Sequence, residues 1–83
     1  MNENNNQKKV VVFSTPTCPW CVKAKEYLSE NNIPFRDVDV SQDHVAAQQM
    51  ILKSGQMGVP QLWIDDGVIV GFDKIAIDSL LGL

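Results

Sequence analysis

The sequence predicts an α/β fold whose elements follow one another in the order β-α-β-α-β-β-α. Segments 10–13, 35–40, 61–64 and 68–70 are rich in the β-branched and aromatic residues that strands favour. Between and after these segments, apolar residues recur at the spacing of one helix face. The first half fits parallel strands joined by a crossover helix, and the second half fits a hairpin followed by a helix. We therefore expect one four-stranded mixed sheet flanked by helices.

The first strand and the first helix meet at an abrupt change of residue type. Val10–Phe13 is an unbroken apolar run, which is typical of a strand buried on both faces. Ser14–Thr17 ends this strand, and Pro19 suits the first turn of a helix, where its missing N–H costs nothing. The helical pattern stops at Asn31–Asn32. Its expected inner face carries Cys21, Ala24 and Leu28.

The middle of the chain predicts a second strand and a second helix. Phe35–Val40 alternates apolar and polar residues, as a strand with one wetter face does. Ser41 is the expected N-cap of the next helix, and Asp43 would lie in its first turn, near the positive end of the dipole. Gly55 is expected to stop this helix. Its expected inner face carries Ala47, Met50 and Ile51.

The last third of the chain predicts a hairpin and a closing helix. Gln61–Ile64 and Val68–Val70 are the expected strands of the hairpin. Asp65-Asp66-Gly67 is expected to join them in a type I′ turn, which Asp-Gly suits. Gly71-Phe72-Asp73 then turns the chain into the last helix. One face of this helix is expected to carry Ile77, Leu80 and Leu81.

Composition and charge limit the partners of the protein. The chain has 83 residues, of which 45% are hydrophobic, so we expect a single domain with a small core. Its net charge is −3, and its Lys and Arg residues form no cationic field of the kind that nucleic acid requires. No apolar run approaches the length of a membrane span. We expect a monomer that binds neither nucleic acid nor membranes.

Residues 1–7 and 8–83 are expected to differ in order. The Asn-rich segment 1–7 has no apolar core, so we expect a disordered lead-in and not a signal peptide. Residues 8–83 would form the domain. A reducing, cytoplasmic setting follows, in which a close pair of cysteines is more often catalytic or metal-binding than structural.

Cys18 and Cys21 are the candidate reactive residues. Cys18 lies where the strand gives way to the helix, and free N–H groups and the helix dipole favour a thiolate there. Cys21 follows one helical turn later on the inner face, so we expect it to be more buried. Cys18 would attack a substrate disulfide, and Cys21 would resolve the mixed disulfide. A disulfide across so short a loop would stabilise the fold little, which favours a redox role.

Other uses of the cysteine pair stay open at this point. Zinc takes four ligands, and the one further soft ligand is His44, so a site within one chain is a ligand short. Zinc or an iron–sulfur cluster bridged between two chains through Cys18 would make the protein a metal carrier. A passive binding module would keep the fold without the chemistry, and a thiol pKa of about 8.5 would indicate it. His44 has no partner in sequence that suggests catalysis, and we expect it in the first turn of a surface helix.

Three motifs in one register resemble those of the glutaredoxins. Thr17-Cys18-Pro19-Trp20-Cys21 is similar to the Cys-Pro-Tyr-Cys motif of the family. Gly58-Val59-Pro60 is similar to its Thr-Val-Pro loop, and Val70-Gly71-Phe72-Asp73 to its Gly-Gly-x-Asp turn. The match runs from about residue 10 to residue 82. It implies a thioredoxin-like fold, a cis-proline facing the cysteines, and a dithiol–disulfide oxidoreductase of electron transport that needs no bound cofactor or metal.

The resemblance also implies a groove for glutathione beside the cysteine pair. Val59, next to the cis-proline Pro60, would offer its backbone to the cysteinyl part of glutathione. The Phe72 N–H and Asp73 would hold the γ-glutamyl end at the start of the last helix. Trp20 would form one wall of the groove. The substrates would be protein disulfides or glutathione mixed disulfides.

Three positions depart from the glutaredoxin pattern. The Lys that the family carries shortly before its first cysteine is Thr15 here, the Thr before Val-Pro is Gly58, and the first Gly of the Gly-Gly pair is Val70. That Lys helps to hold the glycine carboxylate of glutathione, so its absence points to weaker glutathione binding. The neighbouring NrdH-type redoxins accept electrons from thioredoxin reductase, but their usual Arg-Pro after Gly-Phe is Asp73-Lys74 here. Glutathione and a thioredoxin reductase are therefore both candidate electron sources.

Overall fold

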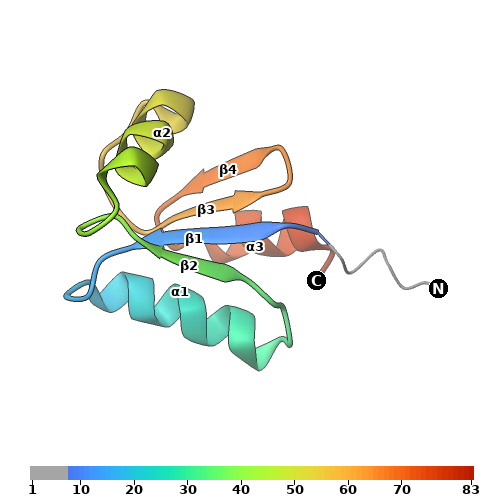
Figure 1. The fold of residues 1–83 in the computed structure, drawn as a ribbon. Coiled ribbons are helices and arrows are strands. Elements are labelled where there is room, and N and C mark those ends of the chain that lie inside the picture. Colours follow the sequence, from blue (N-terminus) through green and yellow to red (C-terminus); the bar gives the residue numbers. More distant parts are fainter. Residues whose placement is uncertain (1–7) are drawn as a thin grey trace.

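The computed structural model describes residues 8–83, which form a four-stranded sheet with helices on both faces (Figure 1). In chain order the elements are β1 (Val10–Ser14), α1 (Pro19–Glu30), β2 (Arg36–Asp39), α2 (His44–Ser54), β3 (Gln61–Ile64), β4 (Gly67–Val70) and α3 (Lys74–Leu81). The strand order is β2-β1-β3-β4; β1 is parallel to β2, and the other neighbours are antiparallel. The predicted α/β architecture is confirmed, whereas the predicted disordered lead-in, residues 1–7, lies outside the described residues.

The main core lies between the sheet and helices α1 and α3. It is formed by Val10, Val12, Ala24, Leu28, Leu62, Ile64, Ile69 and Ile77. Because side chains alternate along a strand, Val11, Phe13 and Trp63 lie on the opposite face of the sheet, which α2 covers (Figure 1). The rings of Phe13 and Trp63 lie 4.5 Å apart between centroids. Met50 is the buried residue of α2. The central strand β1 is thus covered on both faces, as predicted.

The start of α2 differs from the prediction. Its N-cap is Asp43, whose Oδ1 accepts a hydrogen bond from the Ala46 N–H at 3.0 Å. Ser41, the predicted cap, is held in the preceding turn instead, because its N–H donates to Asp39 Oδ1 at 2.9 Å. The helix therefore begins two residues later than expected. Ile51, predicted for the inner face, is 36% exposed.

The hairpin turn is also not the predicted type. Within the described residues φ is positive at Asp65 (50°) but not at Asp66, whereas a type I′ turn needs a positive φ at both central residues. Hydrogen bonds to Lys9 hold Asp65: its N–H donates to the Lys9 carbonyl, and its Oδ1 accepts from the Lys9 N–H, both at 2.9 Å. Gly67 begins β4, and a Cβ there would come within 2.6 Å of Leu80 Cδ1. The end of the Leu80 side chain on α3 thus occupies the space that a Cβ would take at Gly67.

Candidate active site

Cys18 is the N-cap of α1. Its backbone is extended, with φ −107° and ψ 107°, and its Sγ accepts a hydrogen bond from the Cys21 N–H at 3.1 Å. Pro19 occupies the first helical position, where no N–H donor is needed. A sulfur atom thus takes the place that a Ser, Asp or Asn oxygen usually takes at a helix start. The Cys18 sulfur therefore lies at the N-terminus of α1, beside a backbone N–H donor.

Cys21 differs from Cys18 in its burial. Cys21 is completely buried against the core, whereas Cys18 is only partly buried, and both are free thiols. Burial raises the pKa of the Cys21 thiol to about 11, and the hydrogen bond and charge of Cys18 contribute to this rise. The backbone of Thr15 and the positive charge of Lys25 act in the opposite direction. The predicted difference in burial is confirmed, and the division of labour between the two thiols stays a prediction.

The loop before β3 faces Cys18. The peptide bond between Val59 and Pro60 is cis, in agreement with the resemblance. The Val59 carbonyl oxygen lies 3.9 Å from Cys18 Sγ. On the other side, the Gly71 N–H donates to the Pro60 carbonyl at 2.8 Å, which joins this loop to the turn before α3. Two loops that are distant in sequence therefore meet beside the reactive sulfur.

A groove of about 300 Å³ lies between these loops and the start of α1. It is lined by Trp20, Val59, Pro60, Gly71 and Phe72. Trp20 is 58% exposed, and its ring centroid lies 6.4 Å from that of Phe72. The structure thus brings together four residues that the sequence predicted for the glutathione groove: Trp20, Val59, Pro60 and Phe72. Their role in binding a substrate stays a prediction.

Asp73, the remaining predicted groove residue, caps α3. Its Oδ1 accepts a hydrogen bond from the Ala76 N–H at 3.1 Å, and its side chain is exposed. Gly71, two residues earlier, has φ 87°, a conformation that glycine adopts without strain. The cap explains why an Asp stands at this position, and a contact with substrate stays a prediction. His44 is exposed in the first turn of α2, as expected.

Tyr27 packs against the groove residue Phe72, and no pattern in the sequence indicates this role. Its ring packs edge-on against Phe72, with 5.9 Å between centroids. Its hydroxyl donates a hydrogen bond to the Asp78 carboxylate on α3, and this bond raises the pKa of Tyr27. The two residues are 51 positions apart, so no local pattern could pair them.

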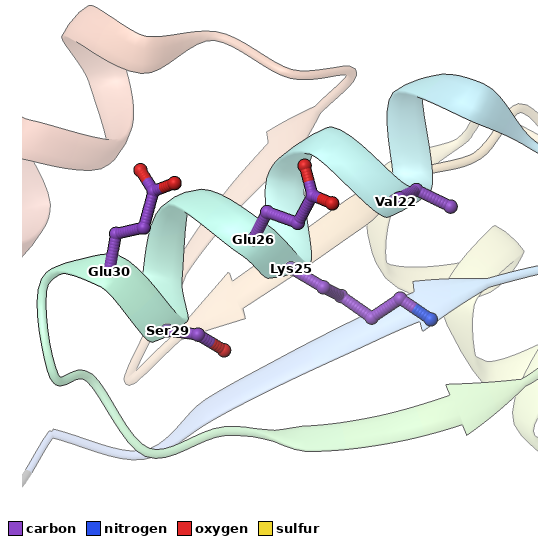
Figure 2. Close-up of a pocket in the computed structure, with 5 residues that line it drawn as sticks. All are labelled: Val22, Lys25, Glu26, Ser29 and Glu30. Atoms are coloured by element: carbon purple, nitrogen blue, oxygen red, sulfur yellow. The ribbon is translucent and has the colours of Figure 1, made fainter.

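A second depression, of about 510 Å³, lies on the outer face of α1 and contains neither cysteine. It is lined by Val22, Lys25, Glu26, Ser29 and Glu30 (Figure 2). In Figure 2, the two glutamates point away from the sheet, whereas Lys25 extends toward the strands. Lys25 Nζ lies 2.9 Å from Asp37 Oδ2 on β2, and the Ser14 hydroxyl donates to Asp37 Oδ1 at 2.7 Å. The depression is formed by one helix alone, so the groove beside Cys18 is the better candidate for a substrate site.

Within residues 8–83 no group of three or more His, Cys, Asp and Glu side chains is arranged to hold a metal ion. None of the helices in this range is both long enough and apolar enough to span a membrane.

Comparisons with known proteins agree with the geometry of the site. Residues 10–69 match the family model described as Glutaredoxin. The chain is 50% identical over 72 residues to an uncharacterized glutaredoxin-like 8.6 kDa protein in the rubredoxin operon of Clostridium pasteurianum, which covers 87% of this chain and 96% of that protein. It is 35% identical over 75 residues to glutaredoxin 3 of Escherichia coli, which covers 89% of this chain and 90% of the relative.

The solved structures lead to the same class. The thioredoxin-like protein BC3987 matches with a TM-score of 0.83 and 33% identity, over 88% of this chain and 100% of that one. The fold and the cysteine pair therefore define a thiol–disulfide oxidoreductase with the thioredoxin-like fold. Within that class, the chain belongs to the glutaredoxin family.

Proposed function

We propose that this oxidoreductase reduces protein disulfides and glutathione mixed disulfides by cycling Cys18 and Cys21 between dithiol and disulfide. The observation that carries the proposal is the difference between the two thiols. Cys18 caps α1 and is partly accessible, whereas Cys21 is completely buried one turn later. We place the activity in the cytoplasm, because glutathione and thioredoxin systems keep thiols reduced there.

The reaction consists of two thiol–disulfide exchanges. The Cys18 thiolate attacks one sulfur of the substrate disulfide, so that a Cys18–substrate S–S bond forms and the substrate S–S bond breaks. The second substrate sulfur leaves as a thiolate and takes a proton from water. Cys21 then loses its proton to water and attacks Cys18 Sγ, which forms the Cys18–Cys21 disulfide and releases the first substrate sulfur as a thiol. The cysteine pair has given two electrons to the substrate. Of the two protons that the substrate sulfurs take from water, one replaces the proton that Cys21 lost to water and the other comes from the solvent, because Cys18 entered the reaction as a thiolate.

The surroundings of Cys21 support this order of events. Burial holds the pKa of its thiol at about 11, and the hydrogen bond and charge of Cys18 add to this effect. When Cys18 enters a mixed disulfide, its negative charge disappears, but the Thr15 backbone and the Lys25 charge still lower the pKa of Cys21. The pKa of Cys21 therefore falls at the stage at which this thiol must attack Cys18. Before that stage the thiol stays protonated and unreactive.

Glutathione is the electron donor that we propose, bound in the groove beside Cys18. Within residues 8–83 the Val59 N–H donates no hydrogen bond, so it is available to an extended peptide. The Phe72 N–H and Asp73, at the N-terminus of α3, would hold the γ-glutamyl end. Thr15 supplies no positive charge for the glycine carboxylate, so we expect a high KM for glutathione.

An NADPH-consumption assay with two arms tests this proposal. One arm supplies glutathione and glutathione reductase, and the other supplies thioredoxin reductase alone. We expect turnover of a protein disulfide in the glutathione arm, and Thr15→Lys should lower the KM for glutathione. Gln48→Lys, which adds the same charge at an exposed position of α2, is the matched control and should change nothing.

Each other outcome of this assay has a definite meaning. Turnover in the thioredoxin reductase arm alone would assign a different electron donor and contradict the glutathione groove. No turnover in either arm would contradict the proposed function. Full activity of protein prepared without metal would show that neither zinc nor a bridged iron–sulfur cluster is needed for it.

A further inference from the structure

Gln61 is a buried amide directly behind the loop that faces Cys18. It is the first residue of β3, follows the cis-proline Pro60, and is 0% exposed. Its Nε2 donates two hydrogen bonds, to the carbonyl oxygen of Gln56 at 3.0 Å and to that of Gly58 at 2.9 Å. Both hydrogens of one amide therefore bind the stretch of chain that leads into the groove.

The Gln61 amide is only partly satisfied. Gln61 Oε1 is buried and has no hydrogen-bond partner within the described chain, which is an unfavourable state for an amide oxygen. The two carbonyls that the amide binds belong to Gln56 and Gly58, two residues on the surface of the protein. An apolar side chain of similar length would fill the same space without a buried, unpaired oxygen. The two bonds therefore serve mainly to fix the position of the loop.

The loop has few other attachments. At one end the Gln56 N–H donates to Ser54 Oγ at 3.0 Å, and the Ser54 hydroxyl donates to the Gln56 carbonyl at 3.2 Å. At the other end the Gly71 N–H donates to the Pro60 carbonyl at 2.8 Å. Gly58 lies between these points in open space, since no atom lies within 4 Å of the place where its Cβ would be. The hydrogen bonds of the buried Gln61 amide thus hold the middle of the loop in place.

We propose that Gln61 is a positioning residue, which holds Val59 at the right distance from the Cys18 thiolate and so sets the affinity of the groove for the peptide around the substrate disulfide. The Val59 carbonyl oxygen lies 3.9 Å from Cys18 Sγ, so a displacement of the loop changes the shape of the groove directly. The inference rests on the proposed function, in which Val59 pairs with an extended substrate. Gln61 itself has no contact with the sulfur, so its loss should alter substrate binding and leave the chemistry of Cys18 unchanged.

Kinetics of Gln61→Met, with Gln48→Met on the exposed face of α2 as the matched control, test the proposal. The KM for a peptide disulfide should rise about tenfold in Gln61→Met, which corresponds to the loss of one or two neutral hydrogen bonds. The kcat and the rate at which iodoacetamide alkylates Cys18 should stay unchanged, because this reagent is too small to need the groove. Gln48→Met should match the native protein in every measurement.

Hydrogen exchange of the Gly71 amide gives a second readout that does not depend on activity. This amide donates to the Pro60 carbonyl, so it should exchange faster when the loop is released in Gln61→Met. Gln61→Glu keeps the shape of the side chain but loses both N–H donors, and it should show the same faster exchange and higher KM. Gly71 exchange also separates this inference from the proposed function, because it can be measured even if the native protein reduces no disulfide.

Three results would overturn the inference. The first is an unchanged KM together with unchanged Gly71 exchange in both Gln61 variants. The second is a fall in Cys18 alkylation that parallels the rise in KM, because Gln61 would then act on the thiolate. The third is failure of both variants to fold, which would make the amide a requirement of the fold and not of the groove.

Discussion

Helices α1 and α2 begin with nearly the same backbone conformation but with different capping atoms. The α1 cap, Cys18, has φ −107° and ψ 107°, and its sulfur accepts from an N–H three residues later at 3.1 Å. The α2 cap, Asp43, has φ −101° and ψ 92°, and its carboxylate accepts the corresponding bond at 3.0 Å. The same local geometry therefore stabilises a helix in one place and holds a nucleophile in the other.

What distinguishes the two caps is their surroundings. Cys18 faces the Val59 carbonyl at 3.9 Å and adjoins the groove, whereas Asp43 lies on the α2 side of the sheet. The backbone conformation of Cys18 is that of an ordinary helix N-cap, so it does not by itself make the site reactive. A reactive site needs a sulfur at a helix start and a second loop that faces it.

The largest expected effect comes from giving α1 the kind of cap that α2 has. Cys18→Asp keeps an acceptor for the Cys21 N–H, so the free energy of unfolding should change by no more than about 1 kcal/mol. Disulfide reduction should fall to the background rate, because a carboxylate cannot take part in thiol–disulfide exchange. Urea unfolding and the NADPH assay measure the two quantities on one sample. Residual turnover would show that Cys18 is not the nucleophile.

Cys21→Ser should remove one class of substrate and spare the other. The backbone N–H of residue 21 still donates a hydrogen bond to Cys18 Sγ in this variant, so the attack of Cys18 on the substrate disulfide should proceed. Protein-disulfide turnover should be lost because no thiol is left to resolve the mixed disulfide, while glutathione mixed disulfides should still be reduced with free glutathione as the second thiol. Assays on both substrates, with Ser79→Ala on the exposed side of α3 as a control, make the distinction. Full protein-disulfide turnover would refute the resolving role of Cys21.

The buried thiol should respond to the loss of its neighbour. The pKa of Cys21 is about 11, mainly because of burial and in part because of the hydrogen bond and charge of Cys18. Below that pKa the thiol is protonated, so alkylation of Cys21 should be slow near neutral pH and accelerate as the pH rises. In Cys18→Ser the charge is gone, and the pH profile of alkylation should move to lower pH. A profile that stays in place or moves upward would contradict the coupling between the two thiols.

The smallest expected effects concern the two aspartate caps. Asp43→Ala and Asp73→Ala should each lower the free energy of unfolding by about 1 kcal/mol, since each loses one capping bond. Asp43→Ala should leave the kinetics unchanged, whereas Asp73→Ala should also raise the KM for glutathione. Thermal unfolding of both variants measures the loss of stability, and assays at varied glutathione concentration measure the KM. Identical kinetics in the two variants would limit Asp73 to capping α3.

Much of the fold followed from local sequence patterns, and the deviations have local physical causes. The apolar run Val10–Phe13 predicts a strand buried on both faces, and β1 extends it by one residue to Ser14. Two candidates, Ser41 and Asp43, compete for the N-cap of α2. The choice depends on Asp39, which binds the Ser41 N–H and hydroxyl and so holds that residue in a turn. The spacing of apolar residues along the helix does not show which of two neighbouring residues will be its N-cap.

Some residues of the candidate site could be predicted from local sequence features and others could not. Cys18 and Cys21 could be predicted because their spacing and their place at a strand–helix junction are local features. Tyr27 and Gln61 could not, because their roles depend on where other parts of the chain come to lie. Tyr27 bonds a residue 51 positions away, and Gln61 turns back to bind two carbonyls of an irregular loop.

Trapping of the mixed disulfide shows which cysteine attacks the substrate and which one resolves the intermediate. Cys21→Ser and Cys18→Ser would each be incubated with a disulfide-bonded peptide, and the intact mass of the protein followed over time. We expect Cys21→Ser to gain one peptide on Cys18 through a bond that a reductant cleaves, and Cys18→Ser to gain none in the same period. An adduct on Cys21 that forms as fast in Cys18→Ser, or no adduct on Cys18, would contradict this expectation.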